Sequence, residues 1–400
     1  MLIRAGIRGL GDSTSPREAT VLELLFDIVY VFALARLAGR VADDLTIVRH
    51  TLLSEAGQTL LFFTAMWMIW SLNALMASTF DPRRTDLQVV LLATMFGTLI
   101  LAVSLPQAFG ERGVVFACTY VVIQIGRPLY LTLALRGHPM WPGPARVLCW
   151  HLATGVLWVG GAISGGTGRG VFWTVALAIE VLGAATNWPT PIRAIRRGGV
   201  RIAFPHLAER YNQFFMIALA EVMVETGFAV SFPGLSIERT AILVAAFLAV
   251  VAYWRIYFYH SGQIRAAPAN SGSSAGEELQ LSQWASLSLL LIVGGIICTA
   301  VGFGQVVEDP DPPIDWALVV IIFGGPALFL IGRAFLAPPR NGRRRSYVLF
   351  VGVLALGLAA PPMVLMRPLA AVVTAALILV AVAVYDRLTY RRAPETNPAL

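Results

Sequence analysis

Long apolar runs follow one another through most of the 400-residue chain, and short segments rich in arginine, glycine or proline separate them. Each run can form a helix of about 20 residues, the length that crosses a hydrocarbon layer roughly 30 Å thick. The separators at 164–170 and 361–362 are so short that they predict tight helical hairpins. The pattern therefore predicts twelve transmembrane helices, at 17–38, 51–76, 87–109, 113–135, 147–166, 171–189, 209–232, 238–260, 278–306, 315–336, 346–363 and 366–388.

The composition narrows the class of protein. Hydrophobic residues make up 57% of the chain and charged residues only 13%, about half the usual charged share. A water-soluble globule is excluded, and the 36 glycines and 23 prolines show no collagen-like period. The apolar content is also far above that of a disordered chain. The predicted fold is an all-α polytopic transmembrane helix bundle of about twelve spans, embedded in a lipid bilayer.

Arginine orients the predicted bundle. The formal net charge is +7, and its positive side is entirely arginine, because the chain contains no lysine. With the amino terminus in the cytoplasm, 20 arginines fall in cytoplasmic segments and six in the opposite loops. The positive-inside rule then predicts that both termini are cytoplasmic. Since the arginines lie in short loops between apolar runs, we expect no nucleic-acid partner despite a pI near 9.7.

No residue pattern indicates a metal or a cofactor. Cys118, Cys149 and Cys298 lie in apolar runs without CxxC or Cys/His spacing, so neither a disulfide framework nor a zinc site is predicted. His206 and Glu209 share a helical face, but the other histidines are scattered, which favours an interfacial histidine over a metal ligand. Walker loops, serine elbows and dinucleotide fingerprints are also missing from the sequence.

Several residues recur at a similar spacing in the two halves of the chain. Ile125-Gly126-Arg127 returns as Ile331-Gly332-Arg333, 206 residues later. Other matches are Glu23 with Glu221 and Gly97 with Gly295, both at 198 residues, and Trp70 with Trp254 at a smaller offset. Two six-helix repeats would share one orientation because six is even, and chance matching between apolar segments is the alternative.

This duplication divides the chain into three parts. Residues 1–189 form the first six-helix half, residues 190–210 form a basic cytoplasmic connector, and residues 211–400 form the second half with a short tail.

Carboxylates inside the apolar runs are the candidate functional residues. Ser15-Pro16-Arg17-Glu18 has the pattern of a capping box, and counting from Pro16 places Asp27 roughly 16 Å into the first span. Glu23 lies one turn before Asp27, and Glu221 and Glu225 form a similar pair in the seventh span. A charge at the bilayer centre costs about 2.5–3.5 kcal/mol. Glu23, Asp27 and Glu221 are therefore predicted to handle a proton or a cation, and fully paired structural carboxylates are the alternative.

Other residues are candidates for compensating charge or binding a substrate. Arg127 lies in mid-span and is the favoured partner of a buried carboxylate, whereas Arg255 is expected to reach water near a helix end. Glu180 is a single acid within a span. Two acids packed together can retain a proton at neutral pH. The aromatic residues that can line a cavity are Trp70, Trp254 and Tyr257, for which an interfacial belt is the alternative.

The residues around these acids resemble a known family, the bacterial low temperature requirement A family. Its opening signature is similar to Glu18-Ala-Thr-Val-Leu-Glu23-Leu-Leu-Phe-Asp27-Ile-Val-Tyr-Val-Phe-Ala33, and its second to His206-Leu-Ala-Glu209-Arg210-Tyr followed by Ala218-Leu-Ala-Glu221. Gln124-Ile-Gly-Arg127 and Tyr253-Trp-Arg-Ile-Tyr-Phe258 also resemble family blocks. The chain departs at Ala220, where the family usually has glycine, and at Gly39, where it often has histidine. The resemblance implies a multi-pass protein of the bacterial plasma membrane, without naming a substrate.

Three functions fit these features. The leading hypothesis is a proton- or cation-coupled transporter of a small molecule, with Glu23, Asp27 and Glu221 at its centre and Arg127 as counter-charge. The first alternative is a membrane-embedded enzyme that protonates an isoprenoid or lipid, as a cyclase, isomerase or lyase would. The second is a membrane scaffold or sensor. No feature of the sequence indicates an oligomeric state.

Overall fold

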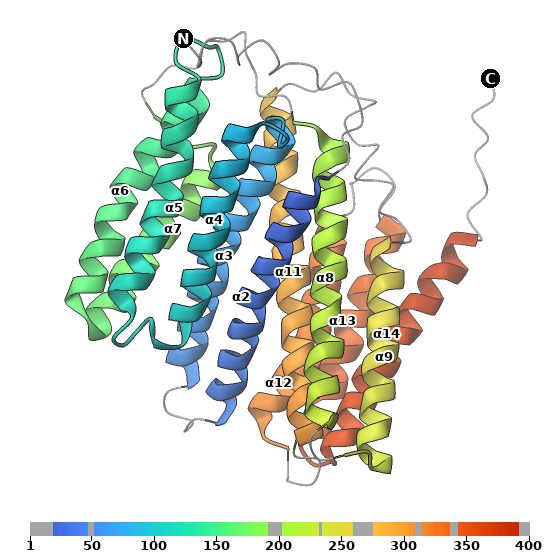
Figure 1. Cartoon of the computed structure of the whole chain (residues 1–400). Coiled ribbons are helices and arrows are strands. Elements are labelled where there is room, and N and C mark those ends of the chain that lie inside the picture. The colour runs from blue at the N-terminus through green and yellow to red at the C-terminus, as the bar shows by residue number, and fades with distance from the viewer. Residues whose placement is uncertain are drawn as a thin grey trace, which may run out of the picture. The chain divides into compact units, whose positions relative to one another are not determined.

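The computed structural model describes residues 19–46, 52–190, 202–231, 234–258, 275–308, 314–336 and 343–391. Within these ranges the chain forms twelve α-helices and one 3-10 turn, η2 (Leu105–Gln107), and no strand (Figure 1). The helices are α2 (Val21–Thr46), α3 (Leu52–Thr79), α4 (Thr85–Ser104), α5 (Gly113–Ala134), α6 (Pro142–Ser164), α7 (Gly166–Ala185), α8 (Phe204–Ser231), α9 (Ile237–Phe258), α11 (Ala275–Glu308), α12 (Trp316–Phe335), α13 (Arg343–Met363) and α14 (Pro368–Arg391).

These helices coincide with the twelve predicted from hydrophobicity, within a few residues at most ends. The largest difference is α2, which ends at Thr46 instead of residue 38. The start of α8 also differs, because Phe204 precedes the expected residue 209. The predicted hairpin at 164–170 is confirmed: Gly165 and Gly166 join α6 to α7 with φ of +64° and +49°, a conformation that glycine adopts without a Cβ clash.

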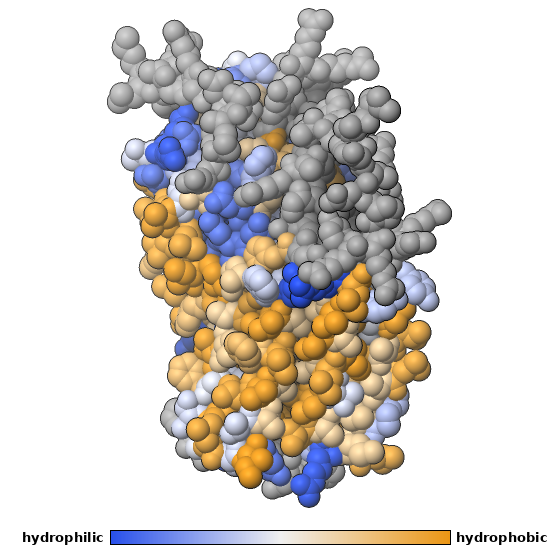
Figure 2. Space-filling view, turned by 90° about the vertical axis from the view of Figure 1, so that its right-hand side faces the viewer, coloured by the Kyte–Doolittle hydropathy of each residue, from blue (hydrophilic) through white to orange (hydrophobic). Residues whose placement is uncertain are grey.

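Among the described helices, ten are long and apolar enough to cross a membrane. The exceptions are α13, whose qualifying apolar part is the shorter Tyr347–Met363, and α2, which carries Glu23, Asp27 and two arginines. Apolar side chains cover the middle of the face in Figure 2, and hydrophilic side chains gather toward its two ends. Many large apolar residues are exposed, as expected of a surface that faces lipid tails.

The chain divides into two compact units. Unit 1 comprises Met1–Phe214 and Ile264–Ser286, and unit 2 comprises Phe215–Gln263 and Leu287–Leu400. Helices α8 and α11 each contribute residues to both units. The predicted division into 1–189, 190–210 and 211–400 stays a prediction.

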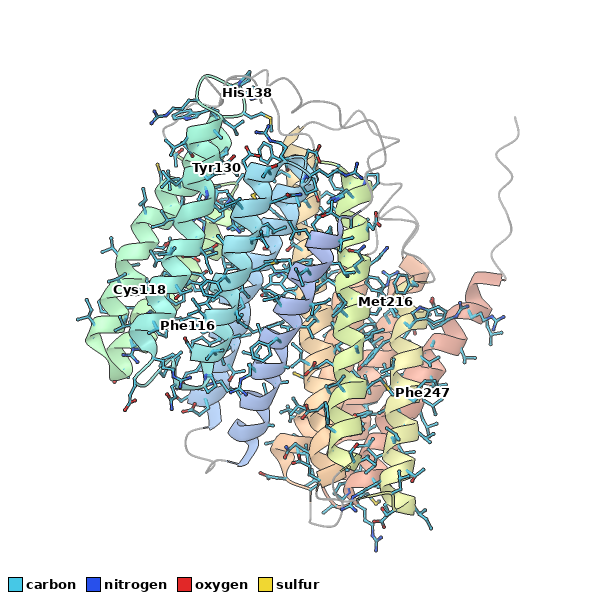
Figure 3. The ribbon with its side chains drawn as sticks, in the orientation of Figure 1. Phe116, Cys118, Tyr130, His138, Met216 and Phe247 are labelled. Carbon is cyan, nitrogen blue, oxygen red and sulfur yellow. The ribbon has the colours of Figure 1, made fainter. Side chains whose placement is uncertain are left out.

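In unit 1, α2 packs on α3 and α4, α5 packs on α4 and α6, and α7 packs on α6 and α3. Inward and outward residues alternate along these helices with the helical period. On α5, for example, Phe116 is fully buried whereas Cys118 is exposed two residues later (Figure 3). Aromatic rings fill much of this core: Phe62 makes edge contacts with Phe116 and Trp173, which contact each other in a tilted arrangement.

In unit 2, α9 packs on α14, and α12, α13 and α14 pack on one another. Helix α11 approaches α12 closely at Gly295, where a Cβ would lie 2.5 Å from the Gly325 carbonyl oxygen and 2.6 Å from the Phe329 nitrogen. Such close helix contacts through small residues are typical of membrane bundles, where dispersion contacts drive association.

Candidate functional site

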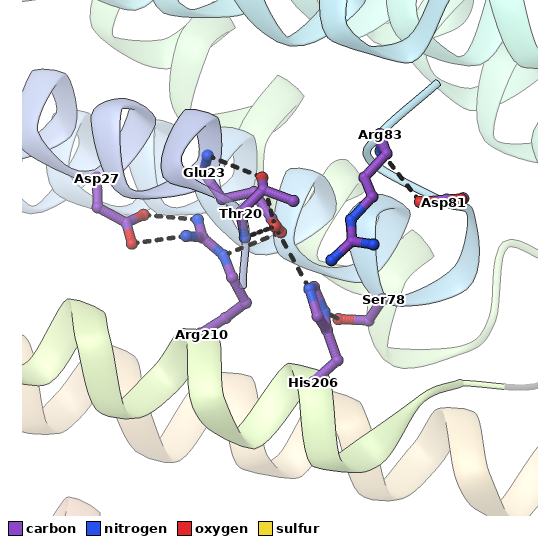
Figure 4. Close-up of polar contacts among 8 residues, drawn as sticks. All are labelled: Thr20, Glu23, Asp27, Ser78, Asp81, Arg83, His206 and Arg210. Atoms are coloured by element: carbon purple, nitrogen blue, oxygen red, sulfur yellow. Dashed lines mark hydrogen bonds and ion pairs between the residues drawn. The ribbon is translucent and has the colours of Figure 1, made fainter. Parts of the chain in front are cut away.

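Asp27 forms a buried bidentate ion pair with Arg210 in unit 1. The two terminal guanidinium nitrogens of Arg210 donate to Oδ2 and Oδ1 of Asp27 at 2.8 and 2.7 Å (Figure 4). The indole Nε1 of Trp70 donates to Oδ1 at 2.9 Å. Asp27 and Trp70 have no exposed surface, and Arg210 is 2% exposed. The carboxylate is therefore neutralised and supplied with three donors, the arrangement that offsets the cost of burying two charges.

Glu23 belongs to the same network and caps the start of α2. Its Oε2 accepts hydrogen bonds from the backbone nitrogen and hydroxyl of Thr20, at 2.8 and 2.9 Å, and the Thr20 hydroxyl accepts from the Glu23 nitrogen. This reciprocal pair is a capping box. His206 Nε2 lies 3.4 Å from Oε2, and the Nε of Arg210 lies 3.5 Å from Oε1 (Figure 4). His206 also contacts the Ser78 hydroxyl through Nδ1.

The structure corrects the expected depth of these two acids. The capping box at Ser15–Glu18 lies outside the described residues, and the box that the structure shows is formed by Thr20 and Glu23. Because α2 begins at Val21, Asp27 lies only about 9 Å along the helix, instead of the roughly 16 Å expected. Ser78, near the end of α3, and His206, near the start of α8, lie beside the same network. It therefore occupies helix ends of unit 1.

Aromatic rings surround the ion pair on the side away from the helix ends. Trp70 packs against Phe214 with 4.3 Å between ring centroids and against Trp67 with 4.9 Å. Tyr211 lies 5.7 Å from Trp70, and Tyr30 lies 5.6 Å from Phe214. These apolar surfaces keep water from Asp27, which strengthens its attraction to Arg210. Trp70, which is predicted to bind a substrate, donates its indole N–H to Asp27.

Arg127 and Glu180 belong to a second buried network in unit 1. Glu180 accepts hydrogen bonds from Tyr120 at 2.6 Å, Thr154 at 2.8 Å and Trp158 at 3.0 Å. Arg127 donates to Gln124 Oε1, and Gln124 donates in turn to the hydroxyl of Tyr120. Glu180, the single acid of its span, is thus hydrogen-bonded by three uncharged donors.

The prediction that Arg127 directly neutralises a carboxylate is not met within the described part of the chain. Its guanidinium donates to the Ile69 carbonyl oxygen at 3.2 Å and to Gln124 at 2.9 Å. The counter-charge of Asp27 is Arg210, which sequence reasoning passed over because it lies near the predicted end of a span. A usable signal was present: His206 and Arg210 are spaced i, i+4, as are Glu23 and Asp27, so one helix face complements the other.

Glu221 has a different environment, in unit 2. Its side chain is 5% exposed, yet no hydrogen-bond donor from the described residues reaches it, and the charged group that acts on it is Glu225. Glu225 is half-buried and packs on α11 at Gly304, where a Cβ would come within 3.0 Å of its Cγ. Glu308, exposed at the end of α11, acts on Glu225 in turn. Exposure of the carboxylates therefore increases from Glu221 through Glu225 to Glu308.

The remaining predicted site residues lie near the end of α9, also in unit 2. Tyr257 is buried and stacks on Phe215 with 3.8 Å between ring centroids. Arg255 is half-buried. Trp254 is 46% exposed and contacts Phe258, so its ring faces the surroundings of unit 2, as the interfacial interpretation expects. Of the three aromatic residues predicted to line a cavity, Trp70 belongs to unit 1, and Trp254 and Tyr257 belong to unit 2.

The buried charges and ten candidate spans define a class: an all-helical, multi-pass membrane protein with ionic networks inside its bundles. Residues 18–384 match the family model described as Bacterial low temperature requirement A protein (LtrA). The chain belongs to this family. It is also 33% identical over 325 residues to a Rhizobium meliloti (strain 1021) protein named Uncharacterized protein RA0937, covering 80% of this chain and 77% of that protein. No solved structure matches the chain.

Proposed function

We propose that the protein is a proton- or cation-coupled transporter of a small molecule in which Glu221 carries the coupling charge. The observation that supports this proposal is the environment of Glu221, which is 5% exposed and lacks a donor or a counter-charge from the described residues. A buried carboxylate without a partner gains most by binding a proton or a cation. Such a group changes its charge state as an ion arrives or leaves, as coupling requires.

The other buried acids are less suited to this role. Asp27 has a bidentate arginine and an indole donor, and Glu180 has three uncharged donors. Protonating Asp27 would remove the bidentate counter-ion of the buried Arg210, and breaking a buried ion pair typically costs several kcal/mol. We therefore assign Glu23, Asp27 and Glu180 structural roles and move the functional centre to unit 2. Arg127 is no longer the counter-charge of that centre.

Glu225 and Glu308 extend the proposed path from Glu221 to the end of α11. Their charges interact in sequence, Glu221 with Glu225 and Glu225 with Glu308. Exposure rises in the same order, from buried through half-buried to exposed. A row of carboxylates attracts cations and lowers the barrier for an ion to reach a buried site. The row would supply Glu221 from one membrane face.

The enzyme alternative requires a carboxylic acid next to aromatic side chains that can stabilise a carbocation. In unit 1 the acids with such neighbours are Asp27 and Glu180. The oxygens of Asp27 already accept from Arg210 and Trp70, and those of Glu180 accept from Tyr120, Thr154 and Trp158. The scaffold alternative fits the closed networks of unit 1 but gives Glu221 no role. Transport gives a role to Glu221, which those alternatives leave unexplained. The proposed location is the bacterial plasma membrane, with both termini in the cytoplasm.

The test is uptake by proteoliposomes that contain the purified full-length protein. The vesicles are supplied with a bacterial small-metabolite extract, with and without an inward proton or sodium gradient, and the accumulated compounds are measured by mass spectrometry. We expect the wild type to concentrate at least one compound only when a gradient is present. Glu221→Gln should lower that uptake at least tenfold, because an amide cannot exchange a proton or neutralise a cation.

Glu238→Gln is the matched control, since Glu238 is an acid on α9 with 41% side-chain exposure. It should transport like the wild type, and all variants should show wild-type thermal unfolding in detergent. Equal uptake by Glu221→Gln and wild type, or no gradient-dependent uptake by the wild type, would contradict the proposal.

A further inference from the structure

Two buried arginines, one in each half of the chain, make the same kind of contact. Arg127 in α5 donates to the carbonyl oxygen of Ile69 in α3 at 3.2 Å. Arg333 in α12 donates to the carbonyl oxygen of Ile256 in α9, also at 3.2 Å. Both side chains are at most 5% exposed. Each arginine therefore extends from one helix to the backbone of another, at Ile69 in the middle of α3 and at Ile256 in the last turn of α9.

The packing next to these arginines also corresponds. A Cβ on Gly97 of α4 would meet Ile123, four residues before Arg127 in α5. A Cβ on Gly295 of α11 would meet Phe329, four residues before Arg333 in α12. The close glycine approach therefore lies one turn before the arginine in both units. Matching Ile69 to Ile256 further pairs Trp67 with Trp254, which replaces the pairing of Trp70 with Trp254 expected from sequence spacing.

The last helix of each half carries a buried acid at the same offset. Arg127 and Arg333 are 206 residues apart, and so are Glu180 in α7 and Asp386 in α14. Glu180 is 1% exposed and Asp386 is 6% exposed. Glu180 is connected to Arg127 through Tyr120 and Gln124. Helix α14 packs on α12, and the charge of Asp386 acts on Arg333.

We infer that the two halves are copies of one six-helix unit, and that Arg333 with Asp386 is the counterpart in unit 2 of Arg127 with Glu180 in unit 1. In this assignment both arginines are positioning residues. Each one extends from the fourth helix of its half to a backbone carbonyl of the second helix, and the neighbouring acid lies on the sixth helix. The inference stands apart from transport, because it concerns residues to which we assign no part in ion binding.

The duplication also explains the two acid pairs. Glu23 and Asp27 lie 198 residues before Glu221 and Glu225, so they occupy equivalent turns of the first helix of each half. The first pair contacts Arg210 and His206, whereas no described basic residue contacts Glu221. The acids of the first copy have a basic partner, whereas the buried acid of the second copy, Glu221, has none among the described residues.

Double-mutant cycles on the full-length protein in detergent test the assignment, with the midpoint of thermal unfolding as the readout. We expect Arg333→Met and Asp386→Asn each to lower the midpoint by roughly 5 °C. The double variant should lose clearly less than the sum, because removing both charges leaves none unpaired. Arg127→Met with Glu180→Gln should show coupling of the same sign.

The control cycle combines Arg333→Met with Glu180→Gln, which belong to different proposed copies and should be additive. If the methionine variants give no folded protein, Arg333→Lys and Arg127→Lys replace them; they keep the charge but lose the guanidinium geometry. Additive losses for Arg333 and Asp386, with coupling between Arg127 and Glu180, would overturn the correspondence. So would equal coupling in the control cycle.

Discussion

Arg210 is the residue that connects the two acids of the ionic network in unit 1. Its guanidinium fork matches the two oxygens of Asp27, and its Nε faces Glu23. Lysine cannot make this bidentate contact. These three charged side chains are buried together. Removing one of them therefore leaves the buried charge of the others incompletely compensated. This mutual dependence distinguishes a structural ion pair from an acid that exchanges its proton.

Replacing one member of this network should destabilise the fold strongly. We expect Asp27→Asn to lower the free energy of unfolding by about 3–5 kcal/mol, because Arg210 stays buried without its counter-ion. Thermal or denaturant unfolding of the purified protein in detergent measures the loss. The comparison variant is Glu238→Gln, whose exposed partner Arg367 is 3.6 Å away and whose loss should cost at most about 1 kcal/mol. Similar losses for the two variants would show that the Asp27 pair contributes no more than a surface pair.

At the scale of elements, α8 carries two kinds of charge. His206 and Arg210 lie near its start and complete the network of α2. Glu221 lies eleven residues after Arg210 on the same helix, about 16 Å by the helical rise. Glu221 belongs to unit 2 and Asp27 to unit 1, and the proposed function assigns the coupling charge to Glu221 and a structural role to Asp27.

The close contact between α11 and α12 depends on the glycine at position 295, which has no side chain. We expect Gly295→Ala to destabilise the protein by about 1–3 kcal/mol, since the added Cβ would overlap the backbone of α12. Gly126→Ala is the matched control: no atom lies within 4 Å of a Cβ placed there, and alanine favours a helix over glycine. Unfolding midpoints of the two variants check this prediction, and a neutral Gly295→Ala would mean that α11 and α12 are farther apart.

At the scale of the whole molecule, the arginine distribution makes a prediction about topology. We expect both termini to lie in the cytoplasm, because 20 of the 30 basic residues then fall on that side. Fusions of the full chain to alkaline phosphatase, active only outside the cytoplasm, and to green fluorescent protein, fluorescent only inside, measure the location. Phosphatase activity from a fusion at either end would contradict the assigned orientation.

The sequence by itself predicted the helices of the described residues to within a few residues at most ends, because a helix in lipid must be long, apolar and internally hydrogen-bonded. It also identified the acids that are costly to bury, since that cost depends on residue type and on the apolar run around it. Family membership likewise followed from residues in sequence, around Glu23, Asp27 and Glu221. The start of α2 was harder to predict from the sequence, because Thr20-x-x-Glu23 and Ser15-x-x-Glu18 are similar capping patterns five residues apart.

Only the tertiary structure decided which charges meet. Asp27 and Arg210 are 183 residues apart, and pairing at that distance depends on how the helices pack rather than on any local pattern. The same applies to Glu180, whose three donors come from two other helices, and to Glu221, which lacks them. Whether a buried carboxylate is a structural lock or an ion carrier is set by the side chains that packing brings to it, because those side chains fix the free energy of its charged form.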